Sequence, residues 1–294
     1  MLGHLSFDEI MTDDISYLFN NEMQVAVLRL DKLHPVISGN KWFKLRYYME
    51  DAKAQGKNHI ITFGGAWSNH IVATAAACKM NGLKATGIIR GEEPANYSPT
   101  LLKAKELGME FIFISREEYK DKIVPEQFTS SQYYIINEGG AGEMGAKGAT
   151  TILDYCEKNY THYCCAVGTG TMMAGIINAV NTGQTVIGIS VMKNNTGLED
   201  DIRSLIHKDN TNWQLLHDYH FGGYAKHQPS LLAFMNQFYT QTKIPSDFVY
   251  TGKLFYAIND LIEKNFFPAN SNLLIIHSGG LQGNDSLPKG TLIF

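Results

Sequence analysis

The sequence lacks the features that are typical of membrane-spanning, nucleic-acid-binding and secreted proteins. It contains no run of about 18 uninterrupted apolar residues, so no membrane-spanning helix is expected. The formal net charge is −4 and no long run of Lys or Arg occurs, which argues against a nucleic-acid partner. The first residues lack a basic stretch followed by an apolar one, so no secretory signal is expected either.

Cysteine is also scarce. The chain has four cysteines, and of these only Cys164 and Cys165 are close together. Adjacent cysteines are poorly spaced for a zinc site, so no metal is expected. Their apolar surroundings predict two buried thiols instead. This use of cysteine indicates the reducing cytoplasm.

What the sequence does contain is an alternation of short apolar segments and helical patterns. Strands are predicted over residues 58–65, 84–91, 110–115, 162–170, 184–192 and 272–280. Helices are predicted over residues 68–83, 98–109, 142–159 and 171–181. Gly82 is a plausible helix stop, and Ser98 an N-cap followed by Pro99. Such alternation predicts an α/β protein with parallel sheets, although the pattern alone marks no domain boundary.

Several predicted strands end in glycine-containing loops, where open α/β sheets bind ligands. The loop "VGTGT", from Val167 to Thr171, is followed at once by a predicted helix. Glycines let a ligand approach the backbone, and the helix N-terminus offers free N–H groups to an anion. Hydroxyls of Thr169 and Thr171 can add donors. We interpret this loop as a phosphate site, with an ordinary strand-to-helix turn as the alternative.

Neither common nucleotide motif is satisfied. Met173 occupies the position of the third glycine in the dinucleotide fingerprint, and no acidic residue follows at the expected distance. In "GGAGEMGAKGAT", Ala146 separates Gly145 from Lys147 and breaks the resemblance to a Walker loop. A small phosphate-bearing cofactor fits better.

The stretch "SGNKWFKL" places Lys41 beside a turn and next to large aromatic residues. A lysine that is desolvated there would have a lowered pKa, and its neutral amine could attack a carbonyl. Pyridoxal 5′-phosphate (PLP) carries both an aldehyde and a phosphate, so Lys41 and the glycine loop together suggest this cofactor. The alternative is a solvated lysine after a simple turn.

Seven segments in order resemble one family. They are "SGNKWFKLRY", "FGGAWSNHIVATAAA", "NEGGAGEMGAKG", "VGTGTMMAG", "FGGYAK", "VYTGK" and "IIHSGG", and they span residues from about 30 to 280. They are similar to motifs of the fold-type II PLP enzymes, the tryptophan synthase β-like group. Within this group the chain resembles the 1-aminocyclopropane-1-carboxylate (ACC) deaminase and D-cysteine desulfhydrase family.

The resemblance implies which residues bind the cofactor. Lys41 matches the lysine that forms a Schiff base with PLP, and Lys44 matches a second lysine close to the phosphate. Asn69 matches the residue that hydrogen-bonds the ring hydroxyl, and Thr251 the partner of the pyridine nitrogen. The phosphate loop corresponds to Gly168, Thr169, Gly170 and Thr171.

The resemblance also implies which residues act on the substrate. Besides Lys41, these are Ser68, near the substrate carboxylate, and Tyr224 and Tyr250, which face the substrate. Each has a structural alternative: Ser68 could only cap a helix, the tyrosines could be core residues, and Thr251 could be a turn residue.

The residue at position 251 bears on the reaction. ACC deaminases carry Glu there, in Y-E-G-K, whereas Y-T-G-K is the D-cysteine desulfhydrase form. A neutral Thr251 stabilises charge on the ring less, which favours elimination of a good leaving group. The resemblance therefore predicts α,β-elimination from D-cysteine or a similar small D-amino acid, giving pyruvate, ammonia and sulfide. Alternatives are ACC deamination to 2-oxobutanoate and ammonia, a racemase or dehydratase, and an inactive PLP-binding relative.

The implied architecture has two open, twisted parallel-sheet domains with PLP between them. The large domain combines residues 1–45 and 151–294, the small domain comprises 46–150, and a homodimer is expected. Four positions depart from the family pattern, and these departures bear on the shape of the pocket. They are Ser38, Phe43, Tyr47 and Trp67.

Overall fold

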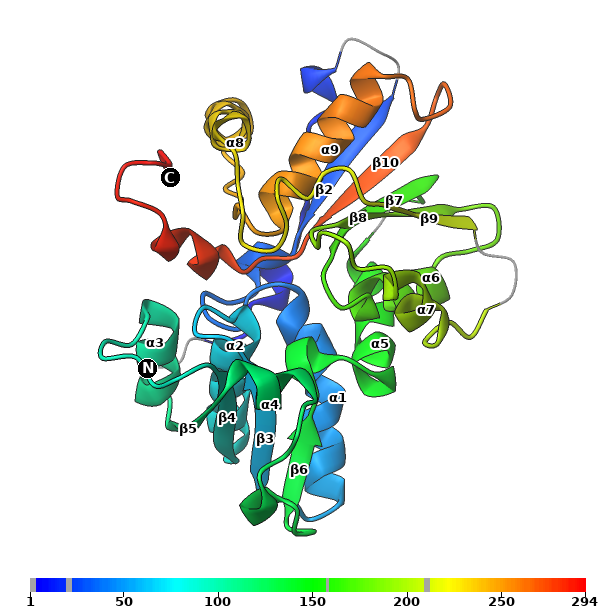
Figure 1. Cartoon of the computed structure of the whole chain (residues 1–294). Coiled ribbons are helices and arrows are strands. Elements are labelled where there is room, and N and C mark those ends of the chain that lie inside the picture. Colours follow the sequence, from blue (N-terminus) through cyan, green and yellow to red (C-terminus); the bar gives the residue numbers. More distant parts are fainter. Residues whose placement is uncertain (1–3, 20–22, 157–158, 209–211) are drawn as a thin grey trace.

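Two open β-sheets organise the chain in a computed structural model that describes residues 4–19, 23–156, 159–208 and 212–294 (Figure 1). The larger sheet has the order β1 (Thr12–Asp14), β2 (Gln24–Arg29), β10 (Asn272–His277), β7 (His162–Val167), β8 (Thr185–Ser190), β9 (Asn212–Leu216). The smaller has the order β5 (Met109–Ile114), β4 (Lys84–Arg90), β3 (His59–Gly64), β6 (Tyr133–Ile136). Every neighbouring pair is parallel except β1 and β2, which confirms the predicted α/β fold with two parallel sheets.

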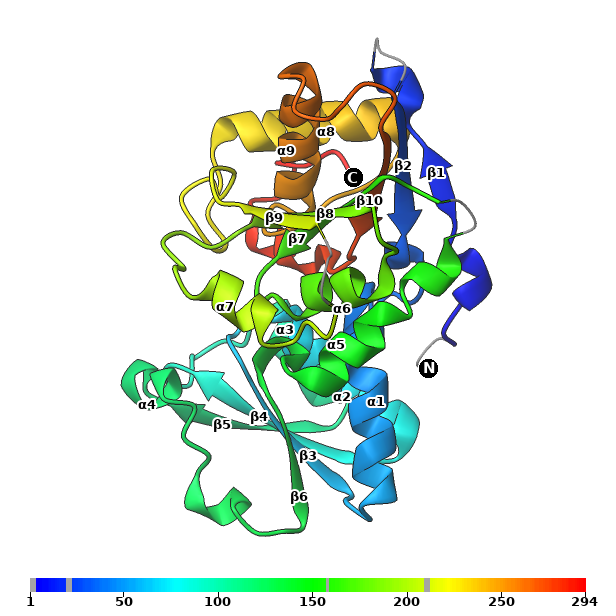
Figure 2. The ribbon, with the colours of Figure 1, turned by 90° about the vertical axis from the view of Figure 1, so that its right-hand side faces the viewer.

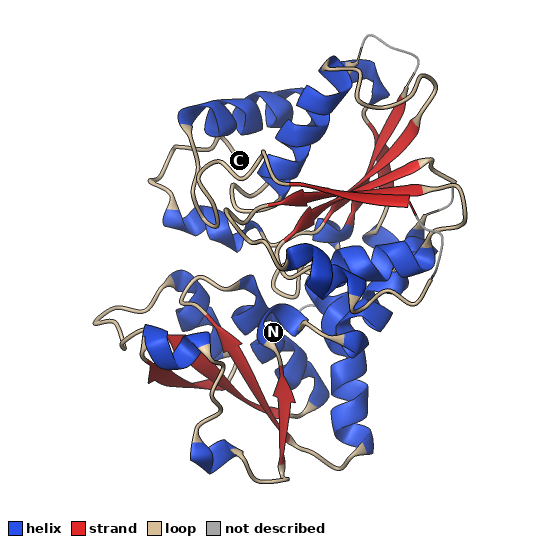
Figure 3. Cartoon of the chain, turned by 45° about the vertical axis from the view of Figure 1, so that its right-hand side comes forward, coloured by secondary structure: helices blue, strands red, loops and turns tan. Residues whose placement is uncertain are grey.

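Helices cover both faces of the larger sheet, as Figure 3 shows. Helix α9 (Thr251–Glu263) packs on one face, with α8 (Pro229–Thr242) beside it. On the other face lie α5 (Glu143–Thr150), α6 (Thr171–Ala179) and α7 (Leu198–Arg203). Strands covered on both sides are apolar throughout. Cys164 and Cys165 of β7 therefore point into opposite layers, and both thiols are fully buried, as expected.

The smaller sheet is covered in the same way. Helices α1 (Asn40–Ala54), α2 (Asn69–Asn81) and α3 (Pro99–Glu106) pack on one face, and α4 (Arg116–Lys120) on the other. The Ser98 hydroxyl accepts a hydrogen bond from the Leu101 N–H at 3.1 Å, which confirms the predicted N-cap. Gly82 ends α2 in the left-handed conformation, as its sequence position predicted.

Helices α1, α5 and α6 pack closely where the two sheets meet (Figure 2). Glycines permit this approach: a β-carbon at Gly148 of α5 would lie 1.8 Å from the Phe43 carbonyl oxygen of α1. A β-carbon at Gly175 of α6 would lie 2.5 Å from the Ala146 carbonyl oxygen of α5. The three helices therefore connect the sheets through backbone contact.

The helix that carries Lys41 was not predicted. Helix α1 begins at Asn40, and Gly39 precedes it with a φ of +63°. Any β-carbon at Gly39 would lie 1.7 Å from the Ser278 carbonyl oxygen, so the turn before the helix requires glycine. Lys41 consequently lies in the first turn of α1. This helix runs through residues 45 and 46, and the proposed domain limits stay a prediction.

The helix predicted over residues 142–159 is shorter than expected. It ends at Thr150, and a single 3-10 turn, Leu153–Tyr155, follows. Residues 157 and 158 of the predicted segment lie outside the described residues. Across the described ranges, no helix is both long enough and apolar enough to cross a bilayer.

Candidate active site

A cavity of about 650 Å³ lies between the two sheets. Its wall contains residues that follow the carboxyl ends of strands in both sheets. Gly65 to His70 follow β3, Glu138 and Gly139 come after β6, Gly168 to Gly170 follow β7, and Ser278 to Gly280 follow β10. Ligand sites of open α/β sheets form at this edge.

The structure brings most of the predicted site residues together on this wall. They are Lys41, Lys44, Ser68, Asn69, Gly168, Thr169, Gly170, Tyr224 and Tyr250. Thr171 and Thr251 are fully buried and do not line the cavity. The chain segments that carry the wall residues are far apart in sequence, which is the arrangement the motifs implied.

Two lysines of α1 enter the cavity with different surroundings. Burial lowers the pKa of Lys41 to about 8, and the nearby Glu138 carboxylate opposes this shift. Lys44 is only 3 % exposed, and burial together with the charge of Lys41 lowers its pKa well below the usual range. The Lys44 amine lies 3.4 Å from the Thr169 hydroxyl oxygen. The structure therefore supplies a lysine with a lowered pKa, as the "SGNK" stretch suggested.

The loop after β7 has the features of an anion site. Gly170 has a φ of +75° and directly precedes α6, so the first N–H groups of that helix lack helical partners. The hydroxyl oxygens of Thr169 and Thr171 lie 3.2 Å apart. Lys44 adds a buried amine beside them. A buried amine next to a helix N-terminus fits a phosphate group.

Ser68 and Asn69, at the start of α2, both line the cavity, and Ser68 also caps the helix. The Ser68 hydroxyl accepts a hydrogen bond from the Ile71 N–H at 3.4 Å, so Ser68 does cap the helix and also lines the cavity. The Asn69 amide nitrogen donates to the Gly280 carbonyl oxygen at 2.9 Å. The Asn69 Oδ1 atom is buried and has no partner among the described residues, so it is free to receive a donor from a bound group.

Two tyrosines form the opposite part of the wall. The ring centroids of Tyr224 and Tyr250 lie 6.0 Å apart in an edge-to-face arrangement. Burial, and then the neighbouring Tyr224, raises the pKa of the Tyr250 phenol well above its usual range. Both phenols therefore stay protonated near neutral pH and can donate hydrogen bonds into the cavity.

The surroundings of Thr251 include an acid that the sequence analysis missed. The Thr251 hydroxyl donates to Asp247 Oδ1 at 2.8 Å and accepts from the Asp247 N–H at 2.8 Å. The Asp247 carboxylate also accepts from the N–H groups of Val249, Tyr250 and Thr251. Burial raises the pKa of Asp247, and these hydrogen bonds oppose that shift. A contact between Thr251 and a ring nitrogen stays a prediction.

Other cavity residues were also missed. His70, Arg90 and Glu138 all line the wall. Arg90 ends β4, so the rule that ligands bind at carboxyl ends of strands could have identified it. No comparable signal marked Asp247. Trp67, whose effect on the pocket was expected from its size, does lie on the wall and is 42 % exposed.

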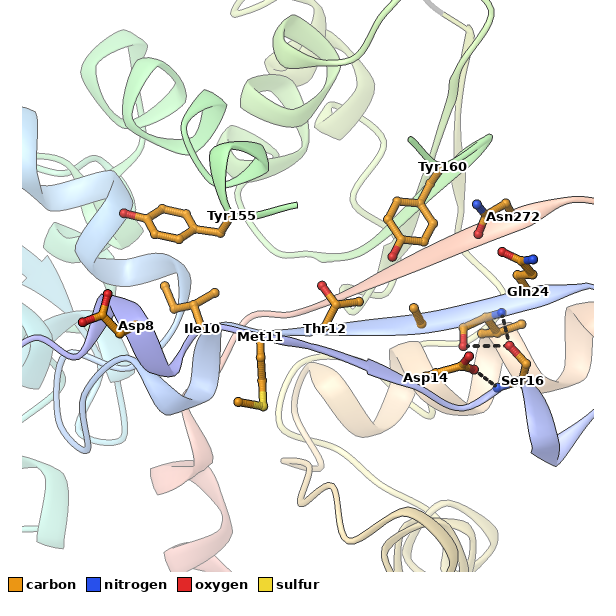
Figure 4. Close-up of a pocket in the computed structure, with 12 residues that line it drawn as sticks. Asp8, Ile10, Met11, Thr12, Asp14, Ser16, Gln24, Tyr155, Tyr160 and Asn272 are labelled. Carbon is orange, nitrogen blue, oxygen red and sulfur yellow. Dashed lines mark hydrogen bonds between the residues drawn. The ribbon is translucent and has the colours of Figure 1, made fainter. Parts of the chain in front are cut away.

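A second cavity, of about 410 Å³, lies beside β1 and β2 (Figure 4). Residues around it include Asp14, Gln24, Tyr155 and Tyr160. None of the predicted site residues lines it. Within the part of the chain that the structure describes, no group of His, Cys, Asp and Glu is arranged to hold a metal ion.

Comparison with known proteins agrees with this geometry. Residues 18–279 match the family described as "Pyridoxal-phosphate dependent enzyme". A putative 1-aminocyclopropane-1-carboxylate deaminase of Pyrococcus abyssi is 31% identical over 288 residues, covering 89% of this chain and 86% of that protein. The bifunctional D-cysteine desulfhydrase/1-aminocyclopropane-1-carboxylate deaminase of Arabidopsis thaliana, a mitochondrial protein, is 27% identical, covering 90% of this chain and 74% of that protein.

A solved structure described as an ACC deaminase homologue aligns with a TM-score of 0.82 and 27% identity, covering 94% of this chain and 90% of that one. The fold, the sequence matches and the cavity with its buried lysines point to the same cofactor. The chain therefore belongs to the fold-type II pyridoxal-phosphate dependent enzymes, in the family of ACC deaminases and D-cysteine desulfhydrases.

Proposed function

We propose that this enzyme catalyses α,β-elimination from D-cysteine or a similar small D-amino acid. With D-cysteine, the carbon–sulfur bond and then the carbon–nitrogen bond break, and one water is consumed. The products are pyruvate, ammonia and hydrogen sulfide, so no oxidant or reductant is needed. The Arabidopsis relative carries both D-cysteine desulfhydrase and ACC deaminase in its name, which supports this pair of candidate reactions.

The residues of the cavity suit the cofactor. We assign the aldehyde to the Lys41 amine, and the phosphate to Lys44, Thr169 and the N-terminus of α6. Asn69 offers a buried acceptor beside them. When bound, PLP supplies the electron withdrawal that makes the α-proton of an amino acid acidic.

The chain's own groups then handle protons and orientation. The Lys41 amine, with its pKa near 8, is placed to accept the α-proton as a general base. Ser68 and the first N–H groups of α2 are suited to the substrate carboxylate. The protonated phenols of Tyr224 and Tyr250 can donate a hydrogen bond to the departing sulfur.

The observation that carries the choice of elimination is the position of Thr251. Its hydroxyl is committed to Asp247, whose oxygens are themselves occupied by backbone N–H groups. Among the described residues of the wall, Glu138 is the one acid, and it pairs with Lys122. When no carboxylate pairs with the pyridine nitrogen of PLP, the cofactor withdraws electrons from the substrate less strongly. This favours substrates with a good leaving group over ring opening of a cyclopropane.

The test is a substrate comparison with the purified, PLP-loaded enzyme. D-cysteine, L-cysteine, D-serine and ACC would be supplied separately, and pyruvate, 2-oxobutanoate, sulfide and ammonia measured. We expect pyruvate and sulfide in equal amounts from D-cysteine, and no keto acid from Lys41→Ala. The visible absorbance of bound PLP would be recorded with each variant.

Each outcome separates the candidates. Release of 2-oxobutanoate from ACC with no turnover of D-cysteine would replace the proposal by ACC deamination. A change of optical rotation without keto acid would identify a racemase. Keto acid from D-serine alone would identify a dehydratase, and a bound cofactor without turnover of any of these would leave a binding protein.

We further propose that the enzyme works in the cytoplasm as a homodimer. The four cysteines are free thiols in the structure, which suits a reducing compartment. Light scattering of the PLP-loaded protein would measure the number of chains.

A further inference from the structure

His70 is a buried residue on the cavity wall to which no role has been assigned. It lies in the first turn of α2, next to Asn69, and is 2 % exposed. Burial, and then the charges of Lys41 and Lys44, lower the pKa of this imidazole well below its usual range. The ring is therefore neutral, with one nitrogen that carries a proton and one that does not.

The neighbours of Thr62 determine which nitrogen carries the proton. The Thr62 hydroxyl donates to the Ile136 carbonyl oxygen at 2.8 Å, and a carbonyl can only accept. The same hydroxyl oxygen lies 2.8 Å from His70 Nε2. Since the single hydroxyl proton is already committed, Nε2 must donate to Thr62. The proton of His70 is thus on Nε2, and Nδ1 is a lone-pair acceptor.

That acceptor is unused within the described residues. His70 Nδ1 is buried from solvent and has no hydrogen-bond partner. An unpaired buried acceptor is costly, so a donor from the cavity is expected to fill it once the site is occupied. The adjacent donors are the amines of the two lysines.

Charges of both lysines act on His70, that of Lys41 more strongly, but Lys41 is assigned to the cofactor aldehyde, which leaves Lys44 as the donor for this acceptor. A β-carbon at Gly140 would lie 3.7 Å from Lys44 Cε and 3.8 Å from His70 Cε1, so the lysine chain and the edge of the ring both lie beside this glycine. The charge of Glu138 acts on Lys41, whereas no carboxylate of the described residues pairs with Lys44. Apart from the Thr169 hydroxyl at 3.4 Å, the Lys44 amine has no hydrogen-bond acceptor among the described residues.

We propose that His70 is a positioning residue: its Nδ1 accepts a hydrogen bond from the Lys44 amine and holds that amine beside Thr169 for the cofactor phosphate. The connected groups run from the Ile136 carbonyl through Thr62 and His70 to Lys44. The negative charge of a bound phosphate would keep the Lys44 amine protonated, with one proton directed to His70, one to Thr169 and the third to the phosphate. This role concerns the cofactor and holds whichever amino acid is the substrate.

The test compares PLP with pyridoxal, which has the aldehyde but no phosphate. Apo-protein of the full chain would be titrated with each, and both dissociation constants measured. For His70→Phe we expect the affinity for PLP to fall about tenfold or more, since one hydrogen bond to a charged group is lost. The affinity for pyridoxal should stay unchanged. His70→Gln keeps an N–H for Thr62 and an oxygen for Lys44, and should restore most of the PLP affinity.

A matched pair at Thr62 tests the proton assignment. Thr62→Val removes the acceptor of the Nε2–H and should weaken PLP binding more than pyridoxal binding, whereas Thr62→Ser should behave like the wild type. In ¹⁵N NMR spectra of the wild-type apo-protein, Nε2 of His70 should carry the proton. Inorganic phosphate should then shift the Nδ1 resonance in the direction of a hydrogen-bonded nitrogen.

Three results would overturn the proposal. The first is an equal loss of PLP and pyridoxal affinity in His70→Phe, which would mean that the ring only shapes the pocket. The second is a failure of His70→Gln to bind PLP better than His70→Phe. The third is a proton on Nδ1 in the NMR spectrum, and this wild-type measurement holds even if a variant fails to fold.

Discussion

Lys41 and Lys44 lie three residues apart in one helix, yet their surroundings prepare them for different tasks. Glu138 acts on Lys41, while Lys44 is more deeply buried beside Thr169. A lysine that attacks an aldehyde must be neutral, which the lowered pKa of Lys41 favours. Burial lowers the pKa of Lys44 as well, so Lys44 would bind phosphate as a cation through the charge that the phosphate itself brings.

The lowered pKa of Lys41 has a measurable consequence for cofactor uptake. Only the neutral amine reacts with the aldehyde, so the rate of PLP uptake by apo-protein should rise with pH and level off above about 8. Stopped-flow absorbance across a pH series would give the midpoint. Glu138→Gln removes the charge that raises this pKa, so its midpoint should move to lower pH. A rate that is independent of pH in both proteins would contradict the assignment of Lys41.

The sequence motifs predicted the residues that face the cavity better than those behind it. Lys41, Asn69 and the glycine loop lie within short segments whose chemistry is visible in the sequence. Asp247 lies four residues before Thr251, in the loop that leads into α9. In the sequence it looks like any acidic loop residue, because its burial depends on the packing of distant segments. The acceptor role of His70 could not be predicted either, since it depends on Thr62 and Ile136 from two other strands.

At the scale of elements, glycines determine how the helices meet. Gly148 of α5 abuts the Phe43 carbonyl, and the next residue of α1 is Lys44. Any shift of α5 would therefore move the helix that carries both lysines. Close packing of this kind leaves no room for an added methyl group.

Gly148→Ala should destabilise the enzyme by about 1–3 kcal/mol, because the new β-carbon overlaps backbone atoms that cannot rotate away. Denaturant unfolding would measure the loss. Gly197→Ala is the matched control: a β-carbon there meets nothing within 4 Å, so stability should change by no more than about 0.5 kcal/mol. Equal stability of the two variants would show that α1 and α5 can separate freely.

Prediction succeeded for six strands and for the helices α2, α3 and α6, whereas it missed α1 and made the helix at 142–159 too long. The predicted strands that became β3, β4, β5, β7, β8 and β10 are short apolar runs with clear ends. Helix α1 was missed because it starts with charged and aromatic residues that resemble a loop motif. The predicted helix at 142–159 was too long, since α5 ends at Thr150 and a 3-10 turn follows at Leu153–Tyr155.

At the scale of the whole molecule, the cavity joins two sheets that have separate cores. Residues from the part of the chain around the larger sheet and from the part around the smaller sheet line this cavity, so one bound molecule would contact both parts. A ligand that binds the folded form alone stabilises it by mass action, by about 2.7 kcal/mol at a hundred times its dissociation constant. PLP should therefore stabilise the joint between the sheets as well as the site.

We expect PLP to raise the melting temperature of the apo-protein, with both sheets unfolding in one transition when it is bound. Differential scanning calorimetry would measure this. Lys41→Ala should show a smaller increase, since only the phosphate contacts remain. An unchanged melting temperature in the wild type at saturating PLP would contradict the placement of the cofactor between the sheets.

The loop after β10 connects the two halves of the site in one further way. The Gly280 N–H donates to the Ser38 hydroxyl at 3.2 Å, and the Gly280 carbonyl accepts from Asn69. Ser38 thus has a partner 242 positions away. The donor is a backbone N–H, which every residue except proline supplies, so an exchange at position 38 requires no compensating exchange at the far end of the gene.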